Sequence, residues 1–280
     1  MMSRVIAVAN HKGGTGKTST TWALGAAMAV RGLHILMIDL DPQASLTLAT
    51  GVRQPERTVW TAMEDVINTG DAPELRDMIV HLDPDGLDLL PSSLALSAAD
   101  LALLNTERRE YVLNEMLAPL AGAYDAILLD CPPALNLLVI NALTAAQEVV
   151  IPVQPDYLAV GGLSLFLQTI ARVKSRKLNP GLRIAGLVLT MTDARTAHDR
   201  SYAPQLHEVA AAQGFPLLGE IPRATAIRDA AAAAVPPTLH SPRHPSAQAY
   251  AALADRLIAD WGLDAPAHTE EMGEREVARG

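Results

Sequence analysis

A glycine-rich turn near the N-terminus contains the residue types needed to hold a phosphate group. His11–Thr18 reads His-Lys-Gly-Gly-Thr-Gly-Lys-Thr and lies between a short apolar run and a helical pattern. Glycines let consecutive backbone N–H groups curl around a phosphate, and the positive end of the following helix dipole adds to the attraction. Lys17 would then reach the β- and γ-phosphates, and the Thr18 hydroxyl would ligate Mg²⁺. The turn therefore predicts ATP and Mg²⁺ as ligands.

This turn departs from the common P-loop pattern at its first position. The pattern begins with a glycine, which His11 replaces, and an additional lysine, Lys12, follows. A loop lysine beside a phosphate also suits simple electrostatic steering, so the residues alone leave the role of Lys12 open. The expected nucleotide contacts are Lys12, Gly13, Gly14, Thr15, Gly16, Lys17, Thr18 and Ser19.

Two acidic motifs follow later apolar runs. Asp39-Leu-Asp41-Pro-Gln follows one run, and Asp130-Cys-Pro-Pro follows another. Proteins hold Mg²⁺ with carboxylates, often through water, and hydrolysis needs a group that orients the attacking water. A single Asp at a strand end is often only a turn or cap residue. Two such motifs behind a phosphate loop favour a catalytic site instead.

Alternating strand and helix patterns would position these motifs. Continuous apolar runs separated by helical segments are typical of βαβ units, which form a mostly parallel sheet with helices on both faces. We therefore expect an α/β, P-loop NTPase-like fold, in which ligands bind beyond the carboxyl ends of the strands. The phosphate turn and both acidic motifs fall there. The expected strands are Val5–Ala9, Ile35–Ile38, Ala126–Leu129, Val149–Val153 and Ile184–Thr190.

The rest of the chain predicts helices, turns and a tail. Helical patterns cover 17–31, 59–67, 94–118 and 246–261, and the run at 83–86, Asp-Pro-Asp-Gly, indicates a turn. We interpret 52–123 as an elaboration within a single domain that covers 1–261. The polar, acidic stretch 262–280 is expected to be disordered.

Composition excludes several classes of protein. The single cysteine, Cys131, excludes an internal disulfide and a multi-cysteine metal or iron–sulfur site within one chain, and it fits a reducing, cytoplasmic setting. The first ten residues have no long apolar run, so no signal peptide is expected. The most apolar stretch, 134–153, contains Asn, Gln, Glu and Pro, which favours a buried helix and strand over a membrane span.

The net charge of −9 argues against a uniformly basic nucleic-acid binder, but the charge is unevenly distributed. Residues 171–260 carry 11 Lys and Arg against 7 Asp and Glu, whereas 1–170 carry 9 against 19. Basic side chains are therefore concentrated in the C-terminal half. On charge alone, ordinary solvated surface explains this distribution.

The three motifs together resemble the deviant Walker ATPases, the ParA/MinD family, over nearly the whole chain. The Asp-Leu-Asp-Pro-Gln form is most similar to the ParA branch that lacks an added N-terminal DNA-binding domain. The resemblance implies an ATP-sandwich homodimer in which Lys12 is the signature lysine that reaches the partner's ATP. It also implies that Asp39 supports the Mg²⁺ shell, that Asp41 orients or activates the attacking water, and that Asp130 lies near Mg²⁺ and the γ-phosphate. Lys12, Lys17, Asp41 and Asp130 are thus the expected catalytic residues.

The resemblance also implies that the ATP-bound dimer binds double-stranded DNA non-specifically and is released when a ParB-like adaptor stimulates hydrolysis. Such binding needs only cations on the right surface, so it would be salt-sensitive and sequence-tolerant. The segment Ile221-Pro222-Arg223 resembles the family's adenine-site and DNA-facing segment, so Pro222 and Arg223 are also expected at the nucleotide. Solvated or salt-bridged arginines remain the alternative. The candidate DNA contacts are Arg195, Arg223, Arg228, Lys174, Arg176 and Lys177.

Two other functions stay open at this point. A MinD-like membrane-positioning ATPase would need a C-terminal amphipathic helix with a basic face, which the acidic run Thr269–Gly280 does not provide. A small-molecule kinase or ligase of the same fold is the other alternative. We expect a cytoplasmic protein that associates with the nucleoid when ATP is bound and does not bind membranes.

Overall fold

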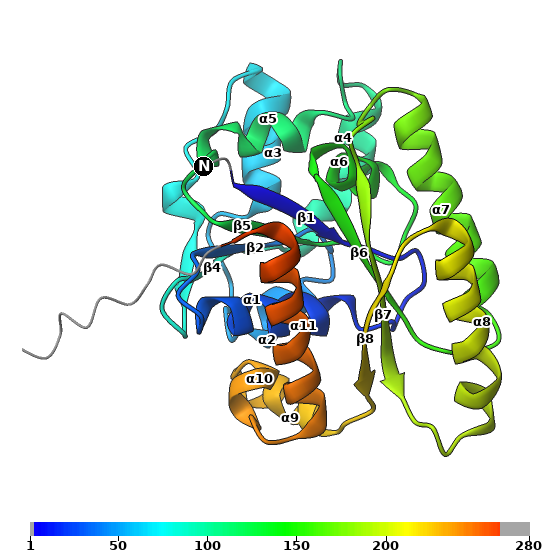
Figure 1. Cartoon of the computed structure of the whole chain (residues 1–280). Coiled ribbons are helices and arrows are strands. Elements are labelled where there is room, and N and C mark those ends of the chain that lie inside the picture. The colour runs from blue at the N-terminus through cyan, green and yellow to red at the C-terminus, as the bar shows by residue number, and fades with distance from the viewer. Residues whose placement is uncertain (1–2, 264–280) are drawn as a thin grey trace, which may run out of the picture.

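One sheet runs through the middle of the molecule, with helices on both sides (Figure 1). The computed structural model describes residues 3–263. The strand order is β3-β4-β2-β5-β1-β6-β7-β8, and only β3 and β4 pair antiparallel. The predicted α/β fold with a mostly parallel sheet is confirmed. The strands are β1 (Arg4–Val8), β2 (Ile35–Asp39), β3 (Val80–Leu82), β4 (Leu87–Leu90), β5 (Ala126–Asp130), β6 (Glu148–Val153), β7 (Arg183–Thr192) and β8 (Leu217–Pro222).

The helices form one layer on each face of the sheet (Figure 1). One apolar core joins the sheet to α3, α5, α6 and α7, and the other joins it to α1 and α11. The helices are α1 (Lys17–Ala29), α2 (Ser45–Ala49), α3 (Val59–Thr69), α4 (Ala99–Leu104), α5 (Val112–Leu117), α6 (Leu137–Ala145), α7 (Ala159–Ser175), α8 (Ala197–Gln213), α9 (Ala226–Ala233), α10 (Pro237–His240) and α11 (Pro245–Trp261).

Side chains of the central strands alternate between these two cores. In β1, Val5 and Ala7 face the α3/α5/α6/α7 side, whereas Ile6 faces α1 and α11. Leu36 and Met37 of β2 divide in the same way. Successive strand residues point to opposite faces, so a sheet that is covered on both faces needs apolar residues at every position. This is why these strands are visible in the sequence as continuous apolar runs.

The segment 134–153 folds as predicted. It forms α6, which is almost entirely buried, followed by β6, whose six residues are all buried. Within residues 3–263, no helix is long and apolar enough to cross a membrane.

Three strands and one break in a helix were not predicted. The turn at 83–86 joins β3 to β4 and thereby adds two strands to the sheet, and β8 forms the opposite edge with a partly exposed face. The predicted helical pattern over 94–118 is confirmed only in pieces: a 3₁₀ helix (Leu94–Ala98), α4 and α5 lie in it, and Arg108 between α4 and α5 has a left-handed φ of 53°. The apolar period continues through the break because α4 and α5 both pack on α6 and α3. The predicted single domain stays a prediction, and so does the disordered tail, of which 264–280 lie outside the described residues.

Candidate functional site

The loop between β1 and α1 has the backbone geometry of a phosphate cradle. Gly14 and Gly16 have φ of 72° and 81°, a left-handed conformation that glycine adopts without steric cost. Asn10 fixes the loop: its Nδ2 donates to the Pro152 carbonyl of β6 (2.8 Å), and its Oδ1 accepts from the backbone N–H of Lys12 (3.3 Å). The loop is therefore held open above the carboxyl ends of β1 and β6.

Lys17 begins α1 and directs its ammonium group back into this loop. Its side chain is buried, and Nζ donates to the Lys12 carbonyl (3.0 Å). Burial lowers the pKa of Lys17, and the nearby Asp130 carboxylate is the strongest influence that raises it. Thr18 and Ser19 follow in the first turn of α1 and are half-buried. This arrangement is suited to binding the phosphates of a nucleotide.

The two acidic motifs meet at the same edge of the sheet. Asp39 and Asp130 are register partners on β2 and β5, and Val8 at the end of β1 is the register partner of Asp130 on the other side. Both carboxylates are fully buried. The three strand ends thus bring the phosphate loop and both acids together, as expected.

The two buried carboxylates differ in their hydrogen bonds. Asp39 accepts from the backbone N–H and hydroxyl of Thr47 (2.9 and 2.7 Å) and from the backbone N–H of Asp41 (3.1 Å). Among the described residues, neither oxygen of Asp130 has a partner in full hydrogen-bond geometry, although the Thr18 hydroxyl is near enough to act against the rise of its pKa. Burial raises the pKa of Asp39 to about 6, and burial together with Asp39 raises the pKa of Asp130 well above its usual range. A buried carboxylate without partners is suited to a cation or a water held by one.

Asp41 lies just outside this buried pair. It is half-buried, and its Oδ1 accepts from the backbone N–H of Gln43 (2.9 Å). Its carbonyl accepts from the Ser92 hydroxyl (2.8 Å), which fixes the loop after β2 to the segment after β4. The Asp41 carboxylate is close enough to Lys17 to raise the pKa of that amine. Asp41 is therefore partly accessible to water and adjacent to the phosphate cradle.

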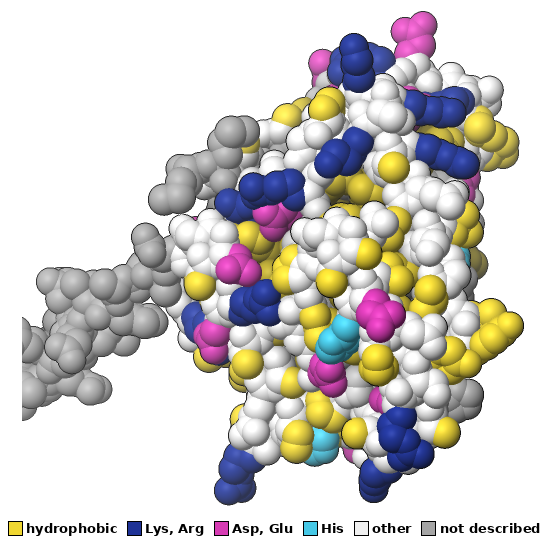
Figure 2. All heavy atoms as spheres, turned by 45° about the vertical axis from the view of Figure 1, so that its right-hand side comes forward, with side chains coloured by type: hydrophobic (Ala, Val, Ile, Leu, Met, Phe, Trp, Pro, Cys, Tyr) yellow, Lys and Arg dark blue, Asp and Glu magenta, His cyan; other side chains and the backbone are white. Residues whose placement is uncertain are grey.

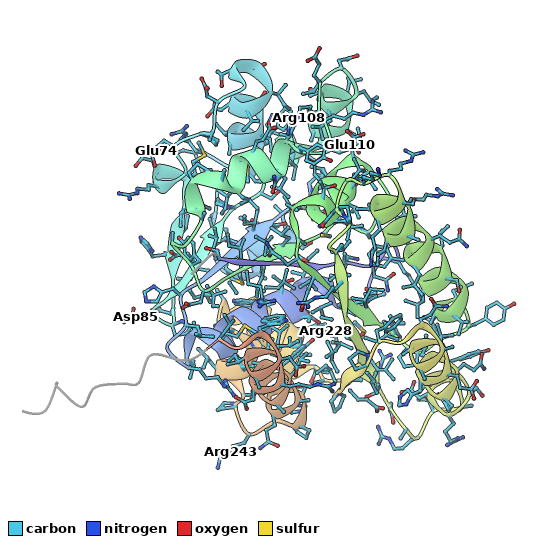
Figure 3. All side chains as sticks on the ribbon, turned by 45° about the horizontal axis from the view of Figure 1, so that its top comes forward. Glu74, Asp85, Arg108, Glu110, Arg228 and Arg243 are labelled. Atoms are coloured by element: carbon cyan, nitrogen blue, oxygen red, sulfur yellow. The ribbon has the colours of Figure 1, made fainter. Side chains whose placement is uncertain are left out.

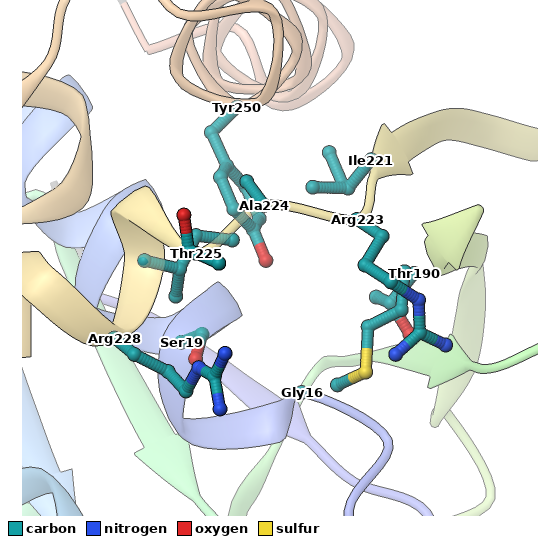
Figure 4. A pocket seen from close by; sticks show the side chains of 11 residues that line it. Gly16, Ser19, Thr190, Ile221, Arg223, Ala224, Thr225, Arg228 and Tyr250 are labelled. Atoms are coloured by element: carbon teal, nitrogen blue, oxygen red, sulfur yellow. The ribbon is translucent and has the colours of Figure 1, made fainter. Parts of the chain in front are cut away.

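A cavity of about 370 Å³ opens beside the first turn of α1 (Figure 4). Its inner wall is apolar and includes Ile221, Ile227 and Tyr250. The Tyr250 hydroxyl and the buried Thr20 hydroxyl of α1 lie 3.2 Å apart, which ties α11 to the helix of the phosphate loop. The cavity has the size and polarity of a nucleoside site. It is lined by Gly16, Ser19, Thr190, Met191, Ile221, Arg223, Ala224, Thr225, Ile227, Arg228 and Tyr250.

Several of these cavity residues were not predicted. Thr190 ends a predicted strand, and its hydroxyl donates to the Thr15 carbonyl of the phosphate loop (2.8 Å). Its position at a strand's carboxyl end was the available signal. Tyr250 gave no such signal, because it lies in a predicted amphipathic helix, where an apolar position indicates only burial in the core. Pro222, an expected adenine contact, ends β8 beside the cavity but is not among the residues that line it.

The candidate DNA contacts separate into two groups. Arg223 and Arg228 are exposed and project from opposite sides of the cavity mouth (Figure 4). Arg195 is exposed nearby, but its guanidinium binds the Asp193 carboxylate through Nε (2.8 Å) and Nη2 (2.9 Å), and this contact lowers the pKa of Asp193 to about 2. The positive charge of Arg223 also helps to lower the pKa of Asp193.

The other three cations lie elsewhere. Lys174, Arg176 and Lys177 are exposed at the C-terminal end of α7, about 20 Å from the end of that helix that touches the phosphate loop. Figure 2 accordingly shows basic side chains in separate groups and not in one continuous patch on this face. Arg243, which was not a candidate, lies in the α10–α11 loop and projects at the lower edge of Figure 3, whereas Arg228 lies near the middle of that view.

Comparison with known sequences finds relatives that match over most of this chain. Residues 3–184 match a family model described as an AAA domain. The chain is 37% identical over 258 residues to the chromosome partitioning protein ParA of Caulobacter vibrioides, covering 91% of this chain and 94% of the relative. It is 36% identical over 259 residues to the sporulation initiation inhibitor protein Soj of Bacillus subtilis, covering 92% of this chain and all of the relative.

Solved structures of related proteins share the fold over the same length. A structure of Mycobacterium smegmatis cobyrinic acid a,c-diamide synthase with bound ADP and magnesium aligns with a TM-score of 0.77 at 36% identity, covering 94% of this chain and 96% of the other. The septum site-determining protein MinD of Pyrococcus horikoshii, complexed with Mg-ADP, aligns with a TM-score of 0.72 at 28% identity, covering 91% and 96%.

Proposed function

The chain belongs to the ParA/MinD family of P-loop ATPases, and we propose that it is a partitioning ATPase whose bound ATP switches on dimerisation and DNA binding. The observation that carries this proposal is the placement of Lys12 and Lys17 in one phosphate loop, with the Lys17 ammonium close to the buried Asp130. Lys17 serves the nucleotide of its own subunit. Lys12 adds a second cation that a single bound nucleotide does not need, which supports a role toward the nucleotide of a second copy.

The described residues fit Mg²⁺ together with ATP. Thr18 supplies a hydroxyl in the first turn of α1, Asp130 supplies two buried oxygens without partners, and Asp39 keeps the adjacent loop in place through Thr47. Hydroxyl, carboxylate and water oxygens are the ligands that Mg²⁺ prefers. The metal supplies charge neutralisation at the phosphates when it is bound.

The proposed hydrolysis needs one group that orients water, and Asp41 is placed for it. Its carboxylate is half-buried beside the cradle, and the hydrogen bonds to Gln43 and Ser92 hold its position. Such a carboxylate can accept a hydrogen bond from the water that attacks the γ-phosphorus while ADP leaves. Lys17 and the backbone N–H groups of the loop stabilise the charge that develops on the phosphate oxygens.

DNA binding is proposed for the surface around the nucleoside cavity. Arg223 and Arg228 line the cavity mouth and are exposed, so closure of a dimer over the nucleotide would double this set of cations. These cations would contact DNA phosphates and not base edges, so the binding would be sensitive to salt and tolerant of sequence. In this proposal a ParB-like adaptor stimulates hydrolysis and releases the dimer, and the protein works in the cytoplasm on the nucleoid.

The dimer is tested by sedimentation of the protein with ATP, with ADP and without nucleotide. We expect a dimer only with ATP, and we expect Lys12→Ala to remain a monomer that still binds ATP. Lys177→Ala is the matched control, because it removes an exposed lysine far from the loop. A Lys12→Ala variant that dimerises like the natural protein would overturn the role of Lys12.

A second candidate function is favoured by the similarity to cobyrinic acid a,c-diamide synthase, which points to ATP-dependent ligation. Some ligation reactions use ammonia that a cysteine nucleophile releases from glutamine. One observation weighs against this form of the reaction. Cys131 is the single cysteine, its thiol is buried, and burial together with Asp130 raises its pKa, so the nucleophilic thiolate is disfavoured. ATP turnover that responds to a carboxylic acid and an amine, but not to DNA and an adaptor, would select ligation.

A further inference from the structure

Lys12 is held by an acid of its own chain. Its ammonium forms an ion pair with the carboxylate of Asp156, and the two side chains are only 26% and 28% exposed. Asp156 lies in the turn between β6 and α7. The structure therefore directs Lys12 toward the start of α7, although the proposed function sends the same ammonium to the nucleotide of a second copy.

Asp156 itself is fixed in place. Its Oδ1 accepts from the backbone N–H of Leu158 (3.1 Å), and its carbonyl accepts from the backbone N–H of Ala159 (3.0 Å), the first residue of α7. Lysine, by contrast, carries its charge on a flexible four-carbon stem. When the pair separates, the group that moves is therefore the lysine ammonium.

A second contact joins the same two segments. His11, the residue before Lys12, packs its ring against Gly162 in the first turn of α7, where a Cβ atom would lie only 2.6 Å from the ring carbon Cε1. Two consecutive residues of the phosphate loop thus contact the start of α7. The carboxylate of Asp156 is kept within reach of Lys12 by packing that does not depend on the ion pair.

We infer that Asp156 is a positioning residue that retains Lys12 within its own subunit and sets how much ATP is needed before two subunits join. This inference rests on the proposed role of Lys12. One ammonium cannot pair with Asp156 and with a partner's phosphates at the same time, so the intrachain pair competes with dimer formation. Only the molecules in which Lys12 is not paired with Asp156 can form the dimer. The apparent affinity of the dimer therefore falls in proportion to the fraction of molecules in which Lys12 is free.

The test uses Asp156→Asn in the full chain. Asparagine keeps a side-chain oxygen that can accept from the Leu158 N–H, so the turn before α7 keeps this hydrogen bond and only the charge is lost. Asp156→Glu is the conservative control that keeps the charge. Dimer fraction is measured by sedimentation against the concentration of a non-hydrolysable ATP analogue, after thermal unfolding has shown that both variants are folded.

Asp156→Asn is expected to reach half-maximal dimer at an analogue concentration about two- to five-fold lower than the natural protein, the range for an ion pair of this exposure. Asp156→Glu is expected to stay close to the natural protein. An unchanged or higher concentration for Asp156→Asn overturns the inference, and a higher one assigns Asp156 to the assembled dimer instead. Lys12→Ala separates the two claims. If this variant dimerises normally, the proposed function fails. If it stays monomeric while Asp156→Asn dimerises at the same analogue concentration as the natural protein, only the positioning role of Asp156 fails.

Discussion

Asp39 and Asp130 are register partners on the neighbouring parallel strands β2 and β5, and both carboxylates are fully buried. Thr47 and the Asp41 N–H satisfy Asp39, whereas both oxygens of Asp130 lack a hydrogen-bond partner among the described residues. Adjacent buried carboxylates disfavour each other's ionised form. The acid pair is therefore a source of instability that the proposed Mg²⁺ would relieve.

This relationship predicts an unusual pH dependence of stability in EDTA without nucleotide. Because the pKa of Asp39 is raised to about 6 and that of Asp130 is also raised, the folded state keeps protons that the unfolded state loses above about pH 4. The free energy of unfolding should then fall as pH rises from 4 to 6, and Asp130→Asn should weaken this fall. Urea unfolding at pH 4.5 and 6.5 measures it. The exposed Asp85→Asn serves as control, and an equal pH dependence in all three proteins would refute the prediction.

Asp41→Asn should stop hydrolysis without preventing nucleotide binding. The amide oxygen keeps the hydrogen bond to the Gln43 N–H, but asparagine cannot act as a base toward water. The turnover rate in saturating ATP should fall by about 100-fold or more, the usual contribution of such a group. Affinity for a fluorescent ATP analogue should stay within a factor of about two. Near-normal turnover in this variant would remove Asp41 from the mechanism.

Tyr250→Phe should destabilise the junction between α1 and α11. The variant leaves the buried Thr20 hydroxyl without its partner, which costs about 1 kcal/mol of unfolding free energy. Tyr157→Phe is the matched control, since that ring is 74% exposed and the change should cost far less. Urea unfolding compares the two. Equal losses would show that the Thr20–Tyr250 contact contributes nothing measurable.

The two groups of cations should contribute unequally to DNA binding. A variant with Ala at 195, 223 and 228 and a variant with Ala at 174, 176 and 177 each lose three positive charges. The first should bind duplex DNA more weakly and lower the slope of log affinity against log salt by about 0.9 for each DNA phosphate that is no longer neutralised. The second should change less, because its residues lie at the far end of α7. ATP affinity is measured in parallel, because Arg223 and Arg228 also line the nucleoside cavity. Equal weakening in both variants would contradict a surface centred on the cavity.

Much of this architecture could be predicted because buried parallel strands and phosphate loops have local signatures. The five central strands are continuous apolar runs, and glycine-rich backbone conformations can be inferred from residue type. The edge strands β3 and β8 could not be predicted, because a half-exposed edge strand carries a mixed pattern. The inner strand β4 was missed because it is only four residues long and its apolar run is interrupted by Asp88. The break before α5 was missed because an apolar period shows burial but not continuity of the helix.

The candidate site divides in the same way. Asp39 and Asp130 could be predicted because each ends a strand, and Lys17 because it begins the helix after the glycine-rich loop, so their meeting depends only on the fold. Tyr250 and Asp156 could not be, because their roles depend on contacts with Thr20 and Lys12, which lie 230 and 144 residues away in the chain. Spatial pairs of this kind leave no spacing pattern in a single sequence.

Binding of a non-specific DNA duplex tests the central claim most directly. The purified protein is titrated onto a labelled duplex of arbitrary sequence, with ATP and with ADP, at about 50 mM and about 200 mM salt, conditions across which affinities built on phosphate contacts fall by orders of magnitude. We predict strong binding with ATP at the lower salt, a large loss at the higher salt, and little binding with ADP. Equal binding with both nucleotides, or none with either, would contradict an ATP-controlled DNA switch.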